Sequence, residues 1–334
     1  MTDINLTLAC GPFDRTQALR DGSVKPEGIN LTYLTLEPAE IFYRMINYRE
    51  FDLSEMSITN YITLVSLGKS PFVAIPVFPS RVFRHGYFFI NTASGIKTPA
   101  DLKGKRGGVV EYRQTAGVYM RGIMQHEYGV RPSDVEWVQA RPDRLGRKLP
   151  PDMKVTTAPP GSQPGDLLEK GEIDFLLSAS PPIAFTRGSP KVARLFPNYR
   201  ELEIDYYKRT KIYPIMHLIV IRKDVHERHP WAALSLYKAF LTAKQRAMQA
   251  LAHAGAPRAS FAWLHSLIEE EQSIIGKDWF PYGVENPAAI TALLQYMKEQ
   301  GLIPRKPSRS CSCRARCGRF RWTKAIRRPD DPSR

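Results

Sequence analysis

Apolar and polar positions alternate in short runs along the first ninety residues of the chain. Residues 4–8 place apolar side chains at every second position, which is typical of a strand. A similar alternation covers residues 29–36, and the apolar run at 71–79 is typical of a buried strand. Between them, apolar residues recur at helical spacing after Pro38, which suits a first helical turn. Strands that alternate with helices in this way predict parallel sheets covered by helices.

The same alternation continues beyond residue 90 and indicates two lobes. Extended segments near residues 90 and 212 connect them. The first lobe is predicted to comprise residues 1–90 and 212–304, and the second, inserted lobe residues 91–211. Because ligands of open α/β sheets bind outside the carboxyl ends of the strands, we expect a ligand cleft between the lobes. Further expected elements are strands at 87–90, 135–138, 173–177 and 213–222, and helices at 231–251, 261–275 and 287–300.

The segment at residues 101–120 has the pattern of an anion site. A short strand ending at Val110 runs into a polar loop, and a helix follows from Ala116. The free N–H groups and the positive dipole end at a helix start bind carboxylates and phosphates. Arg113, in the loop, adds a bidentate donor. The pattern predicts a small anionic ligand and leaves open whether that ligand is carried or transformed.

The positive charge of the chain is concentrated near its C-terminus. The 334 residues carry a formal charge of +15, but residues 305–334 hold eleven Lys or Arg against two Asp or Glu, a net +9. The remaining +6 is spread with both signs over a body that has no recognisable nucleic-acid motif, so we expect no nucleic-acid partner. With 43% hydrophobic residues, the chain can bury an ordinary core.

The last thirty residues differ in composition from the rest of the chain. Cys311, Cys313 and Cys317 lie close together there, but their spacing fits no standard zinc pattern and no His is nearby. This basic tail is either a metal knuckle or tether, or a disordered end or out-of-frame product; we favour the second interpretation. Cys10 is the one cysteine before the tail, so no disulfide framework is expected.

Targeting signals are not recognisable in the sequence. The N-terminus has neither a basic segment nor an apolar run of signal-peptide length. No stretch approaches the roughly 20 apolar residues of a membrane span. We therefore expect a cytoplasmic protein without membrane contact.

Several sequence runs spread over residues 1–300 carry a resemblance to a known family. DLKGKR alone would fit many binding proteins of one fold, whereas FPSRVFRHG and PIMH point to one branch. Together the runs resemble the 4,5-dihydroxyphthalate decarboxylase-like family, which implies an α/β, two-lobed type 2 periplasmic-binding-protein-like fold. The basic tail departs from the family's pattern. The matching runs are LACGPFDRTQAL, VKPEGINLTYL, EIFYRM, EFDLSEMS, SPFVAIPVFPSRVFRHG, SGIKTPADLKGKRGGV, RGIMQHEYGV, GEIDFLLSA, RLFPNY, IYPIMHLIVIR and ERHPWAALSLYKAF.

The resemblance implies a carboxy-lyase of aromatic catabolism. Such an enzyme removes CO2 from 4,5-dihydroxyphthalate and releases protocatechuate without a cofactor. Its partner would be a small aromatic carboxylate, with a homo-oligomer left open. The alternative is a non-catalytic binding protein for an aromatic or heteroaromatic acid that serves transport or sensing. The missing export signal favours the enzyme.

Decarboxylation requires groups that hold carboxylates and a group that protonates the ring. Arg81, Arg84 and His85 lie together in PSRVFRHG, and an extended segment would place Arg81 and His85 on one face. The hypothesis is that the arginines bind carboxylate and His85 is the general acid; the alternative is a hinge histidine with surface arginines. His217, in PIMHLIVIR, is either a second candidate acid or a core histidine. Two histidines without a placed carboxylate make a weak metal site, so no metal is expected.

The remaining candidates follow the ends of predicted strands. Glu55 could accept a proton from a catechol hydroxyl, and Arg15 could bind a carboxylate or form a salt bridge at a helix start. Ser57 could bind ligand or cap a helix. The candidate catalytic residues are therefore His85, His217 and Glu55, and the candidate substrate-binding residues are Asp14, Arg15, Ser57, Arg81, Arg84, Arg113, Gln114, Thr115 and Ser180.

Overall fold

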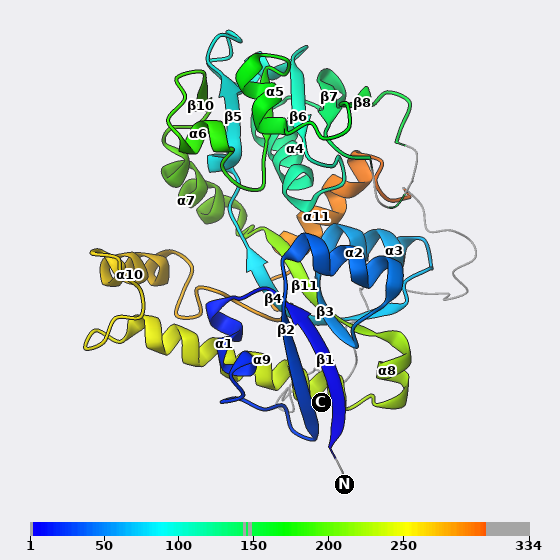
Figure 1. Cartoon of the computed structure of the whole chain (residues 1–334). Helices are drawn as coiled ribbons and strands as arrows, with labels where there is room; N and C mark the ends of the chain where they lie inside the picture. Colours follow the sequence, from blue (N-terminus) through cyan, green and yellow to red (C-terminus); the bar gives the residue numbers. More distant parts are fainter. Residues whose placement is uncertain (1–2, 143–144, 146–148, 305–334) are drawn as a thin grey trace, which may run out of the picture. The chain divides into compact units, whose positions relative to one another are not determined.

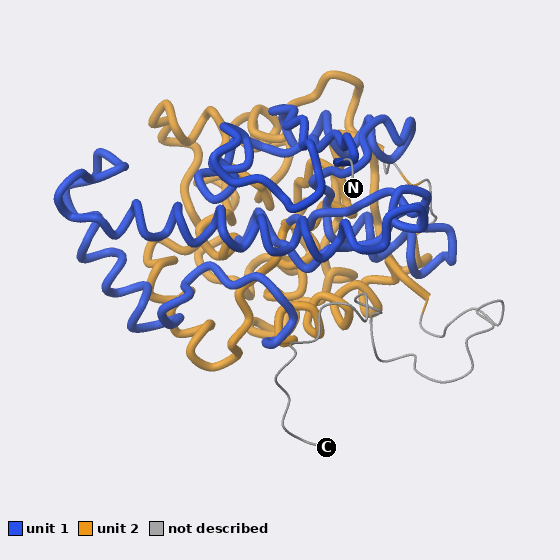
Figure 2. The backbone as a smooth tube through the Cα atoms, turned by 90° about the horizontal axis from the view of Figure 1, so that it is seen from below, with its two compact units in different colours: residues 1–81, 217–286, 309–334 blue, residues 82–216, 287–308 orange. Residues whose placement is uncertain are grey.

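The chain folds into two compact α/β units (Figure 1). The computed structural model describes residues 3–142, 145 and 149–304, and the predicted basic tail at 305–334 lies outside the described residues. Unit 1 consists of the described residues within 1–81 together with 217–286 (Figure 2). Unit 2 consists of residues 82–216 and the described residues from 287 onward. Within the described residues, the chain therefore passes from one unit to the other after residues 81, 216 and 286.

The sheet of unit 1 has five strands in the order β2-β1-β3-β11-β4. β1 pairs in parallel with β2 and β3, whereas β11 runs antiparallel to β3. This register places His217 opposite Ser57 and Ile219 opposite Glu55. The strands are β1 (Ile4–Cys10), β2 (Ile29–Thr35), β3 (Leu53–Ser57), β4 (Phe72–Arg81) and β11 (Ile215–Arg222).

The helices of unit 1 begin where the sequence patterns predict. Pro38 stands at the first helical position of α2, and Ser57 caps α3 by accepting a hydrogen bond from the N–H of Asn60 at 3.4 Å. α10 buries none of its residues. The helices are α1 (Gln17–Arg20), α2 (Pro38–Tyr48), α3 (Ile58–Ser66), α8 (Lys223–Arg228), α9 (Ala232–Ala252) and α10 (Leu264–Ile274).

The sheet of unit 2 has six strands in the order β10-β5-β9-β6-β7-β8. β6 runs parallel to β7 and β9, and β5 runs antiparallel to β9 and β10. The strands are β5 (Phe88–Asn91), β6 (Arg106–Val109), β7 (Glu136–Gln139), β8 (Val155–Thr157), β9 (Phe175–Leu177) and β10 (Val192–Arg194). The helices are α4 (Thr115–Tyr128), α5 (Pro164–Lys170), α6 (Ile183–Thr186), α7 (Tyr199–Thr210) and α11 (Ala288–Glu299).

Two glycines in β6 allow unit 2 to pack closely. A Cβ on Gly107 would lie 2.5 Å from Cζ of Phe175, and one on Gly108 would lie 2.3 Å from Cδ1 of Ile173. Both contacts are far shorter than side chains tolerate. The Gly-Gly pair of the predicted anion motif therefore allows β6 to pack closely against Ile173 and Phe175.

α11 belongs to unit 2, although the sequence analysis assigned residues 287–304 to the first lobe. The helix packs along α4, where a Cβ on Gly122 would lie 2.2 Å from Cδ2 of Tyr296. The hydroxyl of Tyr119 also donates to the carbonyl of Ala289 at 2.9 Å. A glycine within α4 thus creates the space that α11 occupies, and this complementarity decides which unit the last helix joins.

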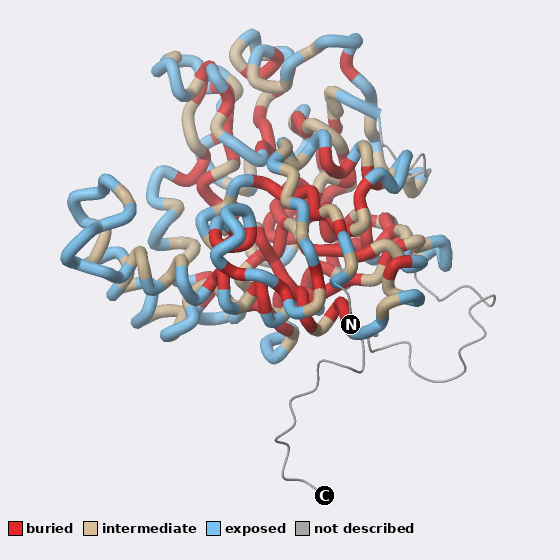
Figure 3. Tube along the Cα trace, turned by 60° about the horizontal axis from the view of Figure 1, so that its bottom comes forward, coloured by how far each residue is buried: buried red, intermediate tan, exposed pale blue. Residues whose placement is uncertain are grey.

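Burial is greatest in strands inside the two sheets: β5 and β9 are buried throughout, whereas the edge strand β8 has no buried residue. Figure 3 shows buried stretches in the interior of the fold and exposed stretches along the outer helices and loops. Within β3 every residue is buried. No helix in the described part of the chain combines the length and the apolar character that crossing a membrane would require.

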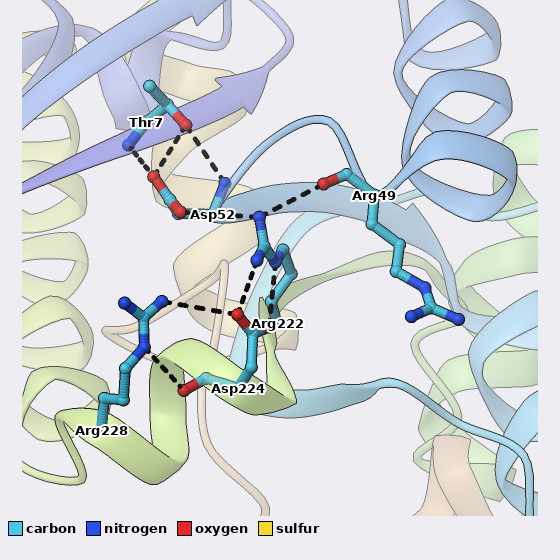
Figure 4. Close-up of polar contacts among 6 residues, drawn as sticks. All are labelled: Thr7, Arg49, Asp52, Arg222, Asp224 and Arg228. Atoms are coloured by element: carbon cyan, nitrogen blue, oxygen red, sulfur yellow. Dashed lines mark hydrogen bonds and ion pairs between the residues drawn. The ribbon is translucent and has the colours of Figure 1, made fainter.

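A network of polar contacts lies at the end of the unit 1 sheet where β3 begins (Figure 4). The Asp52 carboxylate accepts hydrogen bonds from the N–H and the hydroxyl of Thr7, at 2.9 and 3.0 Å. Arg222, at the end of β11, forms an ion pair with Asp224 and lies 3.9 Å from Asp52. The network therefore joins the middle of β1 to the start of β3 and the end of β11, and these ends of β3 and β11 lie opposite to Ser57 and His217.

Candidate functional site

The Glu55 carboxylate is the centre of a buried polar cluster in unit 1. Its side chain has no solvent exposure, and three groups contact it. The backbone N–H of Gly11 donates to Oε2 at 2.9 Å, and the thiol of Cys10 lies 3.7 Å from the same oxygen. Nδ1 of His217 lies 2.5 Å from Oε1. Because β3 lies between β1 and β11, Glu55 receives donors from the end of β1 and from β11.

The thiol of Cys10 is held protonated by this environment. Burial raises its pKa well above the ordinary value, and the nearby negative charge of Glu55 raises the pKa further. The thiol therefore serves Glu55 as a weak donor and is not a nucleophile near neutral pH.

His217 is oriented by Glu55 and Phe42, and its side chain is partly accessible to solvent. Glu55 holds Nδ1, and the ring of Phe42 from α2 packs edge-on against the imidazole with 4.9 Å between ring centroids. The side chain remains 20% exposed, and among the described residues Nε2 has no hydrogen-bond partner. Because Glu55 contacts Nδ1, Nε2 is the ring nitrogen that is left to contact a ligand.

The loop after β1 is fixed by Tyr33. Its hydroxyl donates to the carbonyl of Gly11 at 2.7 Å and lies 2.9 Å from the hydroxyl of Thr16. Gly11 is closely confined, because a Cβ there would lie 3.0 Å from the Phe13 ring and 3.3 Å from Oε2 of Glu55. The backbone donor to Glu55 is therefore held rigidly in place.

Arg15, a predicted carboxylate ligand, contacts its own unit. Its guanidinium lies over the rings of Phe13 and Phe280, at 4.5 and 4.2 Å from their centroids. It also donates through Nε to the carbonyl of Pro79 at 2.8 Å and pairs with Asp14 at 2.7 Å. The structure thus places Asp14 and Arg15 in the salt bridge that was the alternative interpretation, with the Arg15 side chain still 18% exposed.

Arg81 and Ser57 also have partners within unit 1. Nε of Arg81 donates to the carbonyl of Pro281 at 3.0 Å, and its guanidinium lies 4.9 Å from the centroid of the Phe78 ring. Ser57 caps α3 and its hydroxyl lies 3.0 Å from that of Thr59. These contacts orient both side chains at the end of the sheet that carries His217, and ligand binding by them stays a prediction.

His85 lies in unit 2, inside an aromatic cluster. It is 2% exposed and begins a 3-10 turn, with the rings of Tyr206, Phe196 and Tyr128 at centroid distances of 5.4, 5.6 and 6.3 Å. Burial lowers the pKa of His85 to about 4, and the positive charge of Arg209 adds to this effect. His85 is therefore neutral at pH 7.

Arg84 and Glu203 flank this turn. Arg84 donates through Nη1 to the carbonyl of Ala179 at 3.1 Å, and burial lowers its pKa to about 10, so it stays charged. The Glu203 carboxylate accepts a hydrogen bond from the N–H of Gly86 at 3.1 Å. Burial raises the pKa of Glu203 to about 7, which makes it a half-ionised group near neutrality.

The predicted anion motif forms the start of α4. Gln114 is the N-cap residue, and Arg113 and Thr115 are each 3% exposed. Nη1 of Arg113 donates to the carbonyl of Leu302, beyond the end of α11, at 3.1 Å. Ser180 is exposed in the turn after β9. The strand, loop and helix of this motif are confirmed, and its ligand stays a prediction.

Comparison with known proteins places the chain in a family. No protein-family model matches it. A curated 4,5-dihydroxyphthalate decarboxylase from Comamonas testosteroni is 36% identical over 313 residues, which cover 92% of this chain and 95% of the relative. A curated protein of the same name from Pseudomonas putida is 37% identical over 214 residues, covering 62% and 83%. The chain belongs to the 4,5-dihydroxyphthalate decarboxylase family.

The fold of this decarboxylase-family protein is that of a periplasmic binding protein. The crystal structure of the periplasmic aliphatic sulphonate binding protein SsuA from Escherichia coli aligns with a TM-score of 0.53 at 14% identity, over 92% of this chain and 96% of SsuA. The α/β, two-lobed periplasmic-binding-protein-like fold predicted from the sequence is confirmed.

One buried residue of the family member was not singled out by sequence reasoning. Arg121, in α4, is fully buried, stacks on the Tyr112 ring at 3.8 Å and donates to Oε1 of Gln300 at 2.9 Å. A single arginine on a helix gives no sequence signal of burial, because long basic side chains usually extend into water.

A metal site is not formed by the described residues. No group of three or more His, Cys, Asp or Glu side chains lies close enough among them to hold a metal ion. The expectation of a metal-independent reaction stays a prediction that a chelator can test.

Proposed function

We propose that this protein catalyses the non-oxidative decarboxylation of 4,5-dihydroxyphthalate to protocatechuate and CO2. The observation that carries the proposal is the Glu55–His217 pair, present in a chain that belongs to the decarboxylase family. Both curated relatives carry the name of this activity, and the identity to one of them extends over 92% of this chain.

The chemistry requires a proton donor and groups that hold carboxylates. Each carboxylate-bearing carbon of 4,5-dihydroxyphthalate is para to a hydroxyl, which donates electron density to that carbon. A proton adds there, the bond to the carboxylate carbon breaks, and its electron pair returns to the ring as CO2 leaves. The overall step exchanges CO2 for a proton, so its electron balance needs no oxidant or reductant.

We assign the proton transfer to Nε2 of His217. The opposite ring nitrogen is fixed by Glu55, and the side chain is 20% exposed, so Nε2 can approach a ligand. An imidazole is a common general acid in enzymes. His85 suits this role less well, because burial lowers its pKa to about 4 and leaves it without a transferable imidazolium proton at neutrality.

Glu55 takes a different role from the one first hypothesised for it. Both of its oxygens already have donors, and its side chain has no exposure to a substrate hydroxyl. We propose that Glu55 holds the ring of His217 and stabilises the imidazolium, as the buried carboxylate of a hydrolase triad does. Glu55 is thus a positioning residue in this proposal.

Carboxylate binding is proposed for the start of α4. Arg113 and the first N–H groups of this 14-residue helix are the donors that such a group prefers. Arg15 and Arg81 stay proposed ligands in unit 1, with orientations set by their contacts to Pro79 and Pro281.

A turnover assay tests the proposed function. Purified protein is incubated with 4,5-dihydroxyphthalate and a metal chelator, and CO2 and protocatechuate are quantified together. We expect equimolar release of both products. Binding of the substrate without turnover would instead indicate the non-catalytic binding protein, and loss of turnover that added metal restores would contradict the metal-independent mechanism.

A further inference from the structure

Unit 2 contains a guanidinium that is fully buried without an acidic partner. Arg121 has no exposure and donates to two neutral acceptors, Oε1 of Gln300 at 2.9 Å and the carbonyl of Tyr112 at 2.5 Å. Its Nη1 is buried and makes no hydrogen bond. Within the part of the chain that the structure describes, no carboxylate contacts this side chain. The rings of Tyr112 and Trp137 also lie beside it, with their centroids 3.8 and 5.4 Å from Cζ of Arg121.

The charge of Arg121 is retained at a cost in stability. Burial lowers its pKa to about 10, so it is protonated at neutral pH. A buried charge without a counter-ion destabilises a fold unless some other interaction offsets it. Such a residue is expected at a functional position more than at a purely structural one.

Arg121 is the seventh residue of α4, and its guanidinium lies beside the first turn of that helix. A Cβ on Gly117, the third helical residue, would lie 3.1 Å from Nη1 of Arg121. Arg113 is also buried, and its positive charge is close enough to lower the pKa of Arg121. The helix dipole, Arg113 and Arg121 therefore add positive potential at one helix start.

Gln300 preserves this potential. Its side-chain oxygen accepts from Arg121, and its side-chain nitrogen donates to the carbonyl of Val118 at 3.0 Å. A glutamate of the same size would accept the same hydrogen bond and cancel the charge, but it would have no donor for the Val118 carbonyl. The neutral amide orients the guanidinium and leaves its charge available to a ligand.

We propose that Arg121 is a specificity-determining residue that makes the start of α4 favour a dianionic ring dicarboxylate over a monocarboxylate. The inference rests on the proposed function, in which the substrate carries two carboxylates and the product one. Arg121 acts through its field and through the Tyr112 carbonyl and does not contact the ligand. The same preference favours release of the monoanionic product once CO2 has left.

Calorimetric titration with phthalate and benzoate at pH 8 tests this proposal without turnover. The wild-type protein should prefer phthalate. Gln300→Glu places a negative charge beside Arg121 and should weaken phthalate binding about 10-fold and benzoate binding about 3-fold, because a dianion senses the added charge twice. Gln300→Met, which removes the hydrogen bonds and adds no charge, should change both affinities by the same factor.

The melting temperature of the ligand-free variants distinguishes the proposed role of Arg121 from a purely structural one. Gln300→Glu supplies the missing counter-ion but loses the hydrogen bond to the Val118 carbonyl, which Gln300→Met loses as well, so the ligand-free Gln300→Glu protein should melt at a higher temperature than Gln300→Met. Arg121→Gln removes the charge and keeps a donor for the Tyr112 carbonyl. It should lower the ratio of phthalate to benzoate affinity at least as far as Gln300→Glu does.

Three results would overturn the inference. The first is a wild-type protein that binds phthalate no more tightly than benzoate. The second is the same ratio of phthalate to benzoate affinity in the Gln300→Glu and Gln300→Met variants. The third is a ratio in Arg121→Gln that equals that of the wild type. A protein that fails to decarboxylate but shows the expected shifts would contradict the proposed function and leave this inference standing.

Discussion

Glu55 shows how a single buried carboxylate can organise its surroundings. A carboxylate without solvent contact is costly unless hydrogen bonds compensate it. Here the compensation comes from the Gly11 N–H and from His217, residues that lie 44 and 162 positions away in the sequence. The donors that stabilise the carboxylate are therefore also the groups whose positions it determines.

Replacement of His217 by Gln should reduce turnover with little effect on folding. The variant keeps a polar side chain beside Glu55 but has no titratable nitrogen. We expect kcat for 4,5-dihydroxyphthalate to fall about 10²–10⁴-fold, the usual contribution of a general acid, with a melting temperature near that of the wild type. His253→Gln, at an exposed loop position of the same unit, is the matched control and should retain full activity. Full activity in His217→Gln would contradict the assigned proton donor.

Glu203 should make the stability of the protein depend on pH. Its pKa is raised from an ordinary 4.5 to about 7 in the fold, so the folded state binds the proton more tightly than the unfolded chain. The stabilisation is complete below about pH 4.5 and is lost as the pH rises through 7. Relative to Glu203→Gln, the wild type should therefore lose stability between pH 5 and pH 8.

Urea unfolding at both pH values measures this difference. Glu201→Gln, an exposed position on the same helix, should show the pH dependence of the wild type. A Glu203→Gln variant that follows the wild type across this range would show that the carboxyl is not perturbed.

At the scale of elements, the packing of α11 on α4 depends on one glycine. A Cβ on Gly122 would lie 2.2 Å from the Tyr296 ring, a distance that no small shift relieves. α11 in turn leads to Gln300 and Leu302, which contact Arg121 and Arg113. The contact between these helices thus also sets the geometry of the proposed anion site.

Gly122→Ala should destabilise the protein by about 1–3 kcal/mol, the usual effect of overpacking. Urea unfolding measures the change. Because the added methyl group clashes with Tyr296, the cost should fall in a Tyr296→Ala background, which a double-mutant cycle detects as non-additivity. Additive effects of the two substitutions would contradict the close contact.

At the scale of the whole molecule, the described residues cross between the units three times, and the third crossing leads to α11 in unit 2. Residues 287–304 therefore complete the core of a unit whose other residues end at position 216. The folding of unit 2 requires a segment distant in the sequence, which links its stability to the last described part of the chain.

Two truncations should differ sharply in their effect. A chain that ends after Pro304 keeps α11 and the Leu302 carbonyl that binds Arg113, so it should remain folded and retain turnover. A chain that ends after residue 286 lacks α11 and exposes the face of α4 around Gly122, so unit 2 should unfold. Circular dichroism and turnover of 4,5-dihydroxyphthalate distinguish the two. Loss of activity in a folded chain ending at Pro304 would assign a function to the basic tail.

Helix α7 and the short elements β8, β10, α6 and α8 were not predicted from the sequence. The other strands and helices, the family and the periplasmic-binding-protein fold followed from the sequence by itself. They are determined by the spacing of apolar residues and by local signals such as Pro38 at a helix start, which act over a few residues. The tertiary structure alone distinguished partly exposed His217 from buried His85, enclosed Glu55, assigned α11 to unit 2 and left Arg121 without a counter-ion. These properties depend on burial and on partners far apart in the chain, such as Glu55 with His217 and Arg121 with Gln300, which no local pattern encodes.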